Sequence, residues 1–200
     1  MSFSAMTVAE FLAATAMKSP TPGGGAVASV VGALGASLAQ MVVSYSIGKK
    51  NLAEHQETLG LAAAELERAR RVLLTLADED AQAYGLVNEL SRLDEGDPRR
   101  HELAAAQAAS VQIPLAVAAT SVDLLRLFVR LGTCTNRFLR SDLAIAAVLA
   151  EACVTASGWN VRINLPTLAD GPRAETAAQL ATLERDATTL RARVLEVCQG

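Results

Sequence analysis

The fold depends most on residues 51–93, whose sequence is NLAEHQETLGLAAAELERARRVLLTLADEDAQAYGLVNELSRL. It contains no proline, and Gly60 and Gly85 are tolerable inside a helix. Apolar side chains recur at the a and d positions of a seven-residue repeat, as expected of a helix that packs along one seam. The a positions are Leu52, Leu59, Leu66, Leu73 and Val87, and the d positions are Ala62, Ala69, Leu76, Ala83 and Leu90. The stretch therefore predicts one very long helix.

One position of this seam carries a charge. Asp80 stands between Leu73 and Val87, where the repeat calls for an apolar residue. A carboxylate in an apolar seam is tolerated only if it is paired, hydrated or used in a site. Asp80 is therefore the first candidate site residue.

Further helices are expected on both sides of this stretch. Thr7 and Glu10 form a capping box that begins a first helix ending at Met17. Other helices are expected over residues 26–47, from Pro98 to a bend or break at Pro114, over 115–131 up to Gly132, over 141–157 up to an interruption at Gly158, and from residue 170 almost to the C-terminus. Residues 160–165 alternate like a short strand, but no partner strand is evident, so we expect them to be irregular or helical.

Composition supports the same fold class. The chain is 51% hydrophobic, 20% charged and 4% aromatic, and 39 alanines and 28 leucines make up a third of its 200 residues. This predicts an all-α, single-domain bundle of about six to eight helices over residues 1–200. A net charge of -3 gives no strong basic field, so we expect no nucleic-acid partner.

Residues 19–48 contain no charged side chain and are nearly apolar enough to span a bilayer. Their content is largely alanine, glycine and serine, which argues against a membrane span. Small residues recur every fourth position at Gly25, Ser29, Ala33 and Ser37, so neighbouring helices can approach closely. We expect a central buried helix at a subunit interface and no membrane partner.

Cysteine use and the N-terminus indicate the compartment. Cys134, Cys153 and Cys198 are odd in number and form neither a C-x-x-C pair nor a zinc-ligand pattern, so we expect a reducing cytoplasm and no metal site. The first residues do not form a secretory signal. We therefore expect a cytoplasmic protein.

Several residues stand where helix packing does not require them. Residues 19–25, SPTPGGG, form a loop whose glycines either permit close packing or let a ligand approach the backbone. Lys49 and Lys50 follow the second helix, where they suit either its dipole or a substrate. The same choice between a structural and a binding role applies to Asn136, Asp142, Asn160 and Asn164.

Five ordered segments resemble the cyclodeaminase/cyclohydrolase family. They are PTPGGGAVASVVGALGASLAQMV (20–42), IGKK (47–50), DEDAQAY (78–84), SDLAIAAVLA (141–150) and NVRIN (160–164). The family includes the C-terminal domain of formiminotransferase-cyclodeaminase and free-standing methenyltetrahydrofolate cyclohydrolases. The resemblance implies an all-helical homodimer that binds a reduced folate near the dimer interface, with no cofactor beyond the tetrahydrofolate substrate.

The resemblance implies one of two reactions. A cyclohydrolase converts 5,10-methenyltetrahydrofolate and water to 10-formyltetrahydrofolate, and a cyclodeaminase converts 5-formiminotetrahydrofolate to the methenyl compound and ammonia. We expect the cyclohydrolase first, because the 200 residues include no formiminotransferase domain. The alternatives are the cyclodeaminase and a noncatalytic helical dimer or binding module.

The matching motifs also imply residue roles. Asp80 or Asp142 is expected to transfer protons beside the cationic one-carbon bridge. Lys49 or Lys50 is expected to be the partner acid or base, or to hold the folate's glutamate carboxylate. The implied substrate-binding residues are Pro22, Gly23, Gly24, Gly25, Tyr84, Asn136, Ser141, Asn160 and Asn164.

Overall fold

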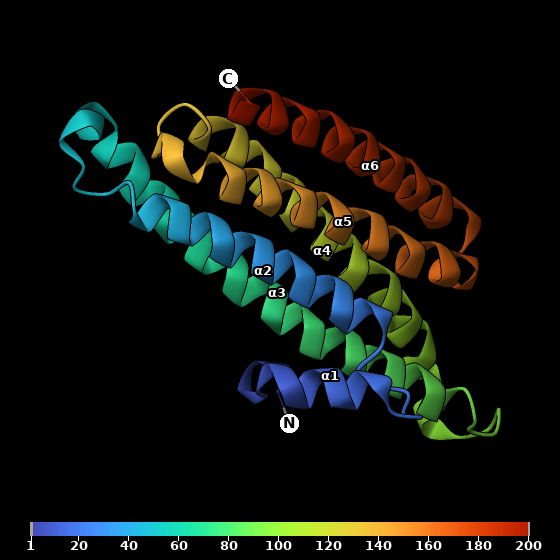
Figure 1. The fold of residues 1–200 in the computed structure, drawn as a ribbon. Coiled ribbons are helices and arrows are strands. Elements are labelled where there is room, and N and C mark those ends of the chain that lie inside the picture. Colours follow the sequence, from blue (N-terminus) through green and yellow to red (C-terminus); the bar gives the residue numbers. More distant parts are fainter. Residues whose placement is uncertain (1, 200) are drawn as a thin grey trace.

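The computed structural model describes residues 2–199, which form six α-helices and no strand. The α-helices are α1 (Val8–Ala16), α2 (Gly24–Ser44), α3 (Gln56–Leu90), α4 (Leu103–Leu131), α5 (Arg140–Asn164) and α6 (Asp170–Gln199). Short 3-10 helices are η1 (Phe3–Ala5), η2 (Lys50–His55), η3 (Pro98–Glu102), η4 (Arg137–Leu139) and η5 (Leu165–Thr167). Helices α2 to α6 form an elongated bundle, and the short α1 lies outside it, near the start of α2 (Figure 1). The predicted all-α bundle is confirmed.

The long helix predicted over residues 51–93 is α3, somewhat shorter at both ends. Residues 50–55 form η2 instead, because the backbone at Leu52 leaves the helical region with φ −122° and ψ 23°. Most of the predicted seam is buried, and Leu59, Leu66 and Leu73 are fully enclosed. The repeat therefore identified the face of α3 that packs against the bundle.

Helix α2 packs closely against its neighbours through small residues, as its sequence predicts. A Cβ at Gly35 would lie 3.1 Å from the carbonyl oxygen of Ala146, and one at Gly32 would lie 2.8 Å from Cys153 Sγ. Both neighbours belong to α5, so these glycines set the spacing of the two helices. By length and composition alone, α2 and the segment 98–131 are apolar enough to cross a membrane, but 56% and 50% of their most apolar windows are buried inside this bundle.

Of the bend or break expected at Pro114, the break is wrong, since α4 runs unbroken from Leu103 to Leu131. Proline has no N–H to donate to the carbonyl four residues earlier, which is that of Ser110. The side-chain amide of Asn164, on α5, donates to this carbonyl at 2.9 Å. The hydrogen bond that the proline removes from α4 is thus replaced by one from a neighbouring helix.

The expected interruption at Gly158 is also wrong, because α5 continues through it to Asn164 and includes most of the 160–165 segment. Gly158 serves packing. A Cβ there would lie 2.5 Å from Glu184 Oε1 and 3.0 Å from Arg162 Nη1, so the glycine leaves room for the ion pair between these two side chains. A close contact with α6 accounts for this residue.

Several predicted helix ends are confirmed. Thr7 and Glu10 form the capping box of α1, and Gly132 caps α4. Helix α1 has no buried residue, and the chain before it is attached to α3 through Asp78, whose Oδ1 accepts from the backbone N–H of Phe3 at 2.7 Å. This attachment holds the N-terminal segment beside the loop that leads into α2.

Candidate active site

A cavity of about 330 Å³ lies where the start of α2 meets α3, α4 and the end of α5. Its lining residues come from four parts of the chain: Pro20, Thr21, Gly23, Gly24, Gly25, Asp80, Tyr84, Val87, Asn88, Ser110, Asn160, Ile163 and Asn164. Seven of the predicted site residues are among them. The cavity thus brings together the glycine loop, the charged position of the seam and the last turns of α5.

Asp80 provides the acidic group of this cavity. Its carboxylate occupies the space beside the Cα atom of Gly25 that a Cβ there would need. Within residues 2–199 it has no ion pair and accepts no hydrogen bond, and burial raises the pKa of the Asp80 carboxyl. A partly desolvated, unpaired carboxylate is suited to take up a proton or to stabilise a cation in the cavity.

Three asparagines add hydrogen-bond acceptors around Asp80. The amide N–H groups of Asn88 and Asn160 donate to the carbonyls of Tyr84 at 3.0 Å and Ala156 at 3.3 Å, respectively. That of Asn164 donates to Ser110 and Asn160. Each amide has two N–H donors, so Asn88 and Asn160 each keep one, whereas the amide oxygens of all three asparagines remain as acceptors. The cavity is therefore suited to a ligand that carries a positive charge and N–H donors.

The glycine loop adds hydrogen-bond donors next to Asp80 and Asn160. Helix α2 begins at Gly24, and Gly23 caps it without a side-chain hydrogen bond. The first N–H groups of a helix have no partner within it and bear partial positive charge. These amides can hold a carbonyl oxygen or another electron-rich group of a ligand. The cavity therefore offers both hydrogen-bond donors and hydrogen-bond acceptors.

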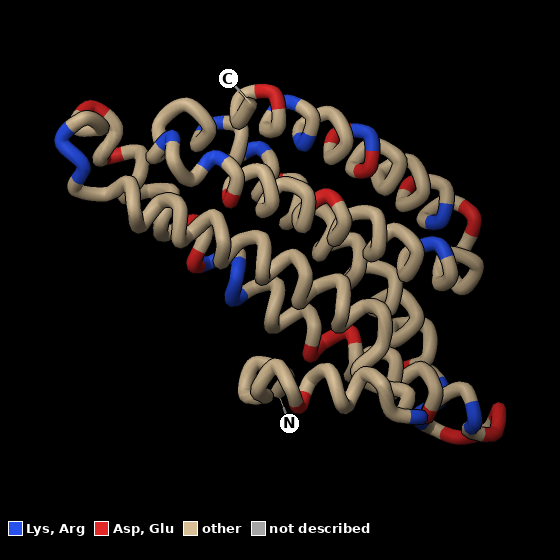
Figure 2. The backbone as a smooth tube through the Cα atoms, viewed as in Figure 1, with Lys and Arg blue, Asp and Glu red and all other residues tan. Residues whose placement is uncertain are grey.

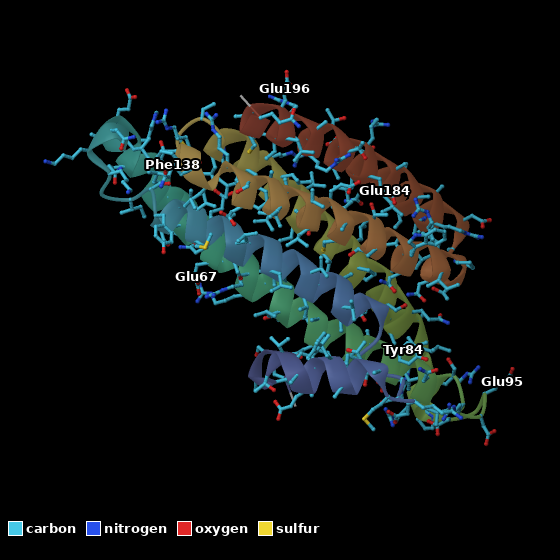
Figure 3. The ribbon with its side chains drawn as sticks, in the orientation of Figure 1. Glu67, Tyr84, Glu95, Phe138, Glu184 and Glu196 are labelled. Carbon is cyan, nitrogen blue, oxygen red and sulfur yellow. The ribbon has the colours of Figure 1, made fainter. Side chains whose placement is uncertain are left out.

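The other predicted site residues lie elsewhere. Lys49, Lys50, Asn136, Ser141 and Asp142 are near the opposite end of α2, about 30 Å away by the rise of its 21 residues. Figure 3 shows the separation, with Tyr84 beside the cavity and Phe138, which follows Asn136 in η4, at the far end. Within one chain, the candidates form two separate groups.

Some residues of this second group have structural roles. Asn136 caps η4 by accepting from Phe138 N–H at 3.2 Å, and its own N–H donates to Ser46 Oγ at 2.9 Å. Asp142 lies in the first turn of α5.

Pro22 is the one predicted residue of the glycine loop that does not line the cavity around Asp80. It is buried, follows a cis peptide bond, and lines a neighbouring cavity with Phe3 and Asp78.

Sequence reasoning missed six residues that line the cavity: Pro20, Thr21, Val87, Asn88, Ser110 and Ile163. Asn88 had a usable signal, because it lies two helical turns after Asp80 and one after Tyr84, both already candidates. Ser110 had none, since only the packing of α4 against α5 places it beside Asn164.

Thiol and metal chemistry find little support in the described part of the chain. Cys134, Cys153 and Cys198 are free, and burial raises the pKa of each thiol, which disfavours the nucleophilic thiolate. Residues 2–199 contain no group of three or more His, Cys, Asp or Glu side chains placed to hold a metal ion.

Known proteins resemble this chain over nearly its whole length. Residues 7–182 match the family model described as formiminotransferase-cyclodeaminase. A methenyltetrahydrofolate cyclohydrolase of Methylorubrum extorquens is 32% identical over 206 residues, covering 97% of this chain and 96% of its own. The crystal structure of formiminotetrahydrofolate cyclodeaminase from Thermotoga maritima has a TM-score of 0.91 at 30% identity and covers 98% of both chains.

Longer relatives match over part of their length. Formimidoyltransferase-cyclodeaminase of Sus scrofa is 30% identical over 192 residues, and that of Mus musculus is 32% identical over 191. These matches cover 93% and 92% of this chain but only 36% and 35% of the relatives. The chain thus spans about a third of these proteins.

Proposed function

Since this chain belongs to the formiminotransferase-cyclodeaminase family, we propose that it is an enzyme acting on the one-carbon unit of tetrahydrofolate. The proposed reaction is that of a methenyltetrahydrofolate cyclohydrolase. Two features support it: the unpaired carboxylate of Asp80 in an acceptor-rich cavity, and similarity over nearly the full length of a cyclohydrolase.

The Asp80 carboxylate is the observation that carries this proposal. The bridge carbon of 5,10-methenyltetrahydrofolate belongs to a delocalised cation, and the pterin ring carries several N–H donors. A single anion among the amide oxygens of Asn88, Asn160 and Asn164 complements both features. Charge and donor pattern therefore favour a cationic reduced folate over an anionic ligand at this end of the cleft.

In the proposed reaction, Asp80 acts as a general base. It removes a proton from a water molecule as the water oxygen bonds to the bridge carbon, giving a neutral tetrahedral intermediate. The bond between that carbon and N5 then breaks as protonated Asp80 gives its proton to N5 and the hydroxyl group loses its proton to water, leaving the formyl group on N10. The raised pKa brings the Asp80 carboxyl nearer to neutral pH, where such a base is most effective.

The alternative is the cyclodeaminase reaction, favoured by the match to the Thermotoga maritima structure. There, N10 attacks the formimino carbon on N5 and the N10 proton passes to the imino nitrogen, after which the bond from this carbon to the resulting amino nitrogen breaks. Protonated Asp80 would deliver a proton to the departing ammonia, and the resulting carboxylate would stabilise the methenyl cation. Both reactions use the same carboxylate beside the same carbon.

We further propose that the protein is a homodimer formed through α2 and α5. Helix α2 carries no charged residue over its whole length (Figure 2). Leu34, at its midpoint, is 54% exposed. Exposed apolar residues continue along both helices at helical spacing, namely Tyr45, Ile145, Val148, Trp159 and Ile163. Such an uncharged apolar face is typical of a subunit interface.

The symmetry of such a dimer bears on the site. In an isologous dimer with antiparallel α2 helices, pairing about Leu34 brings the end of one α2 beside the start of the other. Lys49 of the partner subunit and Lys50 of the partner subunit would then approach the cavity of the first. Ile163 belongs to both this face and the cavity wall, which supports a shared site.

We also propose which cofactors and partners the protein lacks and where it is located. The chemistry written above requires only the folate and water, so we propose no further cofactor. The net charge of -3 supports the absence of a nucleic-acid partner. Packing of α2 within the bundle supports the absence of a membrane partner, and we propose a cytoplasmic location.

The activity test follows methenyl absorbance. Purified protein is mixed with 5,10-methenyltetrahydrofolate, and the loss of absorbance is compared with the uncatalysed rate. Faster loss supports the cyclohydrolase, whereas gain of absorbance from 5-formiminotetrahydrofolate alone supports the cyclodeaminase. If neither substrate reacts, the enzyme proposal fails, and saturable folate binding then decides whether the protein is a folate-binding module.

The dimer test uses light scattering coupled to size-exclusion chromatography. We expect wild type at twice the mass of one chain and Leu34→Asp as a monomer. Leu61→Asp is the matched control, because Leu61 is similarly exposed but lies on α3. A monomeric wild-type protein at micromolar concentration would overturn the dimer proposal.

A further inference from the structure

A groove of about 600 Å³ adjoins the cavity and follows α3 toward its C-terminal end. The two share Pro20, Thr21, Tyr84 and Asn88 as lining residues. Tyr84 is about half exposed between them and is labelled in Figure 3. Cavity and groove therefore form one cleft, of which the Asp80 cavity is the smaller part.

The floor of the groove is a stripe of α3. Ala81, Gly85 and Asn88 follow one another at intervals of four and three residues, which places them on one side of α3, and Arg92 lies in the turn that follows the helix. Gly85 is not explained by packing, because a Cβ there would meet nothing within 4 Å. Nor does it adopt a positive φ angle. The missing side chain leaves this part of the groove floor flat and open to a ligand.

Charge at the far end of the groove favours an anionic group. Glu89 is paired with Arg99, whose Nη1 lies 2.6 Å from Glu89 Oε1. Arg100 donates to the carbonyls of Ser91 and Leu93 at the end of α3. Arg92 lines the groove and, within residues 2–199, lies within 4 Å of no carboxylate. Its position leaves a guanidinium available for a ligand.

The spacing of Asp80 and Arg92 suits this role. Asp80 and Leu90, the last residue of α3, are ten residues apart, about 15 Å along the helix axis, and Arg92 lies in the turn just beyond. An aryl ring followed by one amino acid, together with the reach of the arginine side chain, can bridge such a distance.

We propose that the groove binds the p-aminobenzoyl-glutamate arm of the folate, with the aryl ring on Ala81 and Gly85 beside Tyr84 and a glutamate carboxylate at Arg92. This inference rests on the proposed function. It assigns the carboxylate to an arginine of the same subunit as Asp80, in contrast to the lysines at the other end of α2. The methenyl end of the folate then lies at Asp80.

The first test is Arg92→Gln, with Arg71→Gln as the control because Arg71 is an exposed arginine elsewhere on α3. For Arg92→Gln we expect about a tenfold higher KM for 5,10-methenyltetrahydrofolate, since a charge-assisted contact is lost. With 5,10-methenyltetrahydropteroate, which lacks the glutamate, Arg92→Gln and wild type should have equal KM values. Equal KM values for Arg92→Gln and Arg71→Gln on the full substrate would overturn the proposal.

The second test fills the groove. Gly85→Leu places a side chain on its floor, and Gly60→Leu makes the same change at an α3 glycine that also has nothing within 4 Å of its Cβ position. We expect a raised KM for Gly85→Leu alone, with helix content and melting temperature similar in the two variants. A rise of equal size in both would contradict a groove site.

Failure of the groove proposal can be distinguished from failure of the proposed function, because the reaction rate of the wild-type protein tests the proposed function by itself. Titration of p-aminobenzoyl-L-glutamate by calorimetry requires no turnover. Weaker binding to Arg92→Gln than to Arg71→Gln supports the groove even in an inactive protein. A rise in KM for Lys49→Gln together with none for Arg92→Gln would place the carboxylate at Lys49 and overturn the assignment.

Discussion

The Asp80 carboxylate lies against the Cα atom of Gly25, in the space where any other residue at position 25 would have its Cβ. Asp80 belongs to α3 and Gly25 to the first turn of α2, so the two helices meet at a carboxylate and a missing side chain. The glycine thereby sets the position of the acidic group in the cavity. Most of the site's chemistry depends on this contact.

Gly25→Ala is expected to lower kcat/KM by about a hundredfold, because the new methyl group displaces the Asp80 carboxylate and misplacement of a catalytic group by about 1 Å has an effect of that size. Steady-state assays measure the loss, and circular dichroism confirms the fold. Gly60→Ala is the control, since its Cβ enters open space. An active Gly25→Ala enzyme would show that the carboxylate need not occupy its present position.

Asp80→Asn is expected to lower kcat by about a hundredfold or more, as general-base catalysis is lost, while folate still binds. Glu79→Gln, at the exposed neighbouring residue of α3, should retain activity. For wild type, kcat/KM should rise with pH through the raised pKa of Asp80. Near-normal turnover by Asp80→Asn would remove this carboxylate from the mechanism.

Asp80→Asn should also stabilise the fold at neutral pH. Because the folded-state pKa of Asp80 lies above its unfolded value, its contribution to stability is present below the unfolded value and is lost as pH rises through the folded one. Asp80→Asn should therefore melt at a higher temperature than wild type at pH 7. The difference should disappear below the unfolded pKa of aspartate, near pH 4. A lower melting temperature at pH 7 would contradict the desolvation argument.

Subunit mixing tests whether the site is shared. Asp80→Asn and a Lys49→Gln/Lys50→Gln double variant, each inactive alone, should regain activity when unfolded together and refolded as mixed dimers. Random pairing leaves about a quarter of the sites intact in a two-fold dimer. Light scattering confirms dimer formation. Absence of recovery in mixtures that do form dimers would place both groups in the same subunit's site or remove the lysines from it.

A double-mutant cycle tests the bond between Asn164 and Ser110. Asn164→Ala leaves the partly buried Ser110 carbonyl without its donor and should lower the free energy of unfolding by about 1–3 kcal/mol. Pro114→Ala restores an N–H that can bond the same carbonyl within α4, so Asn164→Ala should have a smaller effect in that background. Urea denaturation measures all four proteins. Additive effects would refute the compensation.

The extent of sequence prediction differs between helices. The seam of α3, the capping box at Thr7 and the end of α4 at Gly132 depend on local periodicity and capping, and all are confirmed. The breaks expected at Pro114 and Gly158 are wrong, because partners distant in sequence compensate the proline and explain the glycine. Local rules describe how a residue affects its own helix, but they do not include the hydrogen bonds and contacts that a neighbouring helix adds.

Spacing along single chain segments was enough to predict the helical fold class, the long α3 and the unusual character of Asp80. Which candidate residues meet depends on the tertiary structure. It joined Asp80 with the glycine loop, Asn160 and Asn164, and it left Lys49 and Lys50 about 30 Å away, because a helix of 21 residues separates its two ends by its own rise. It also revealed the groove to Arg92, since residues 20–21 and α3 form its walls only after folding.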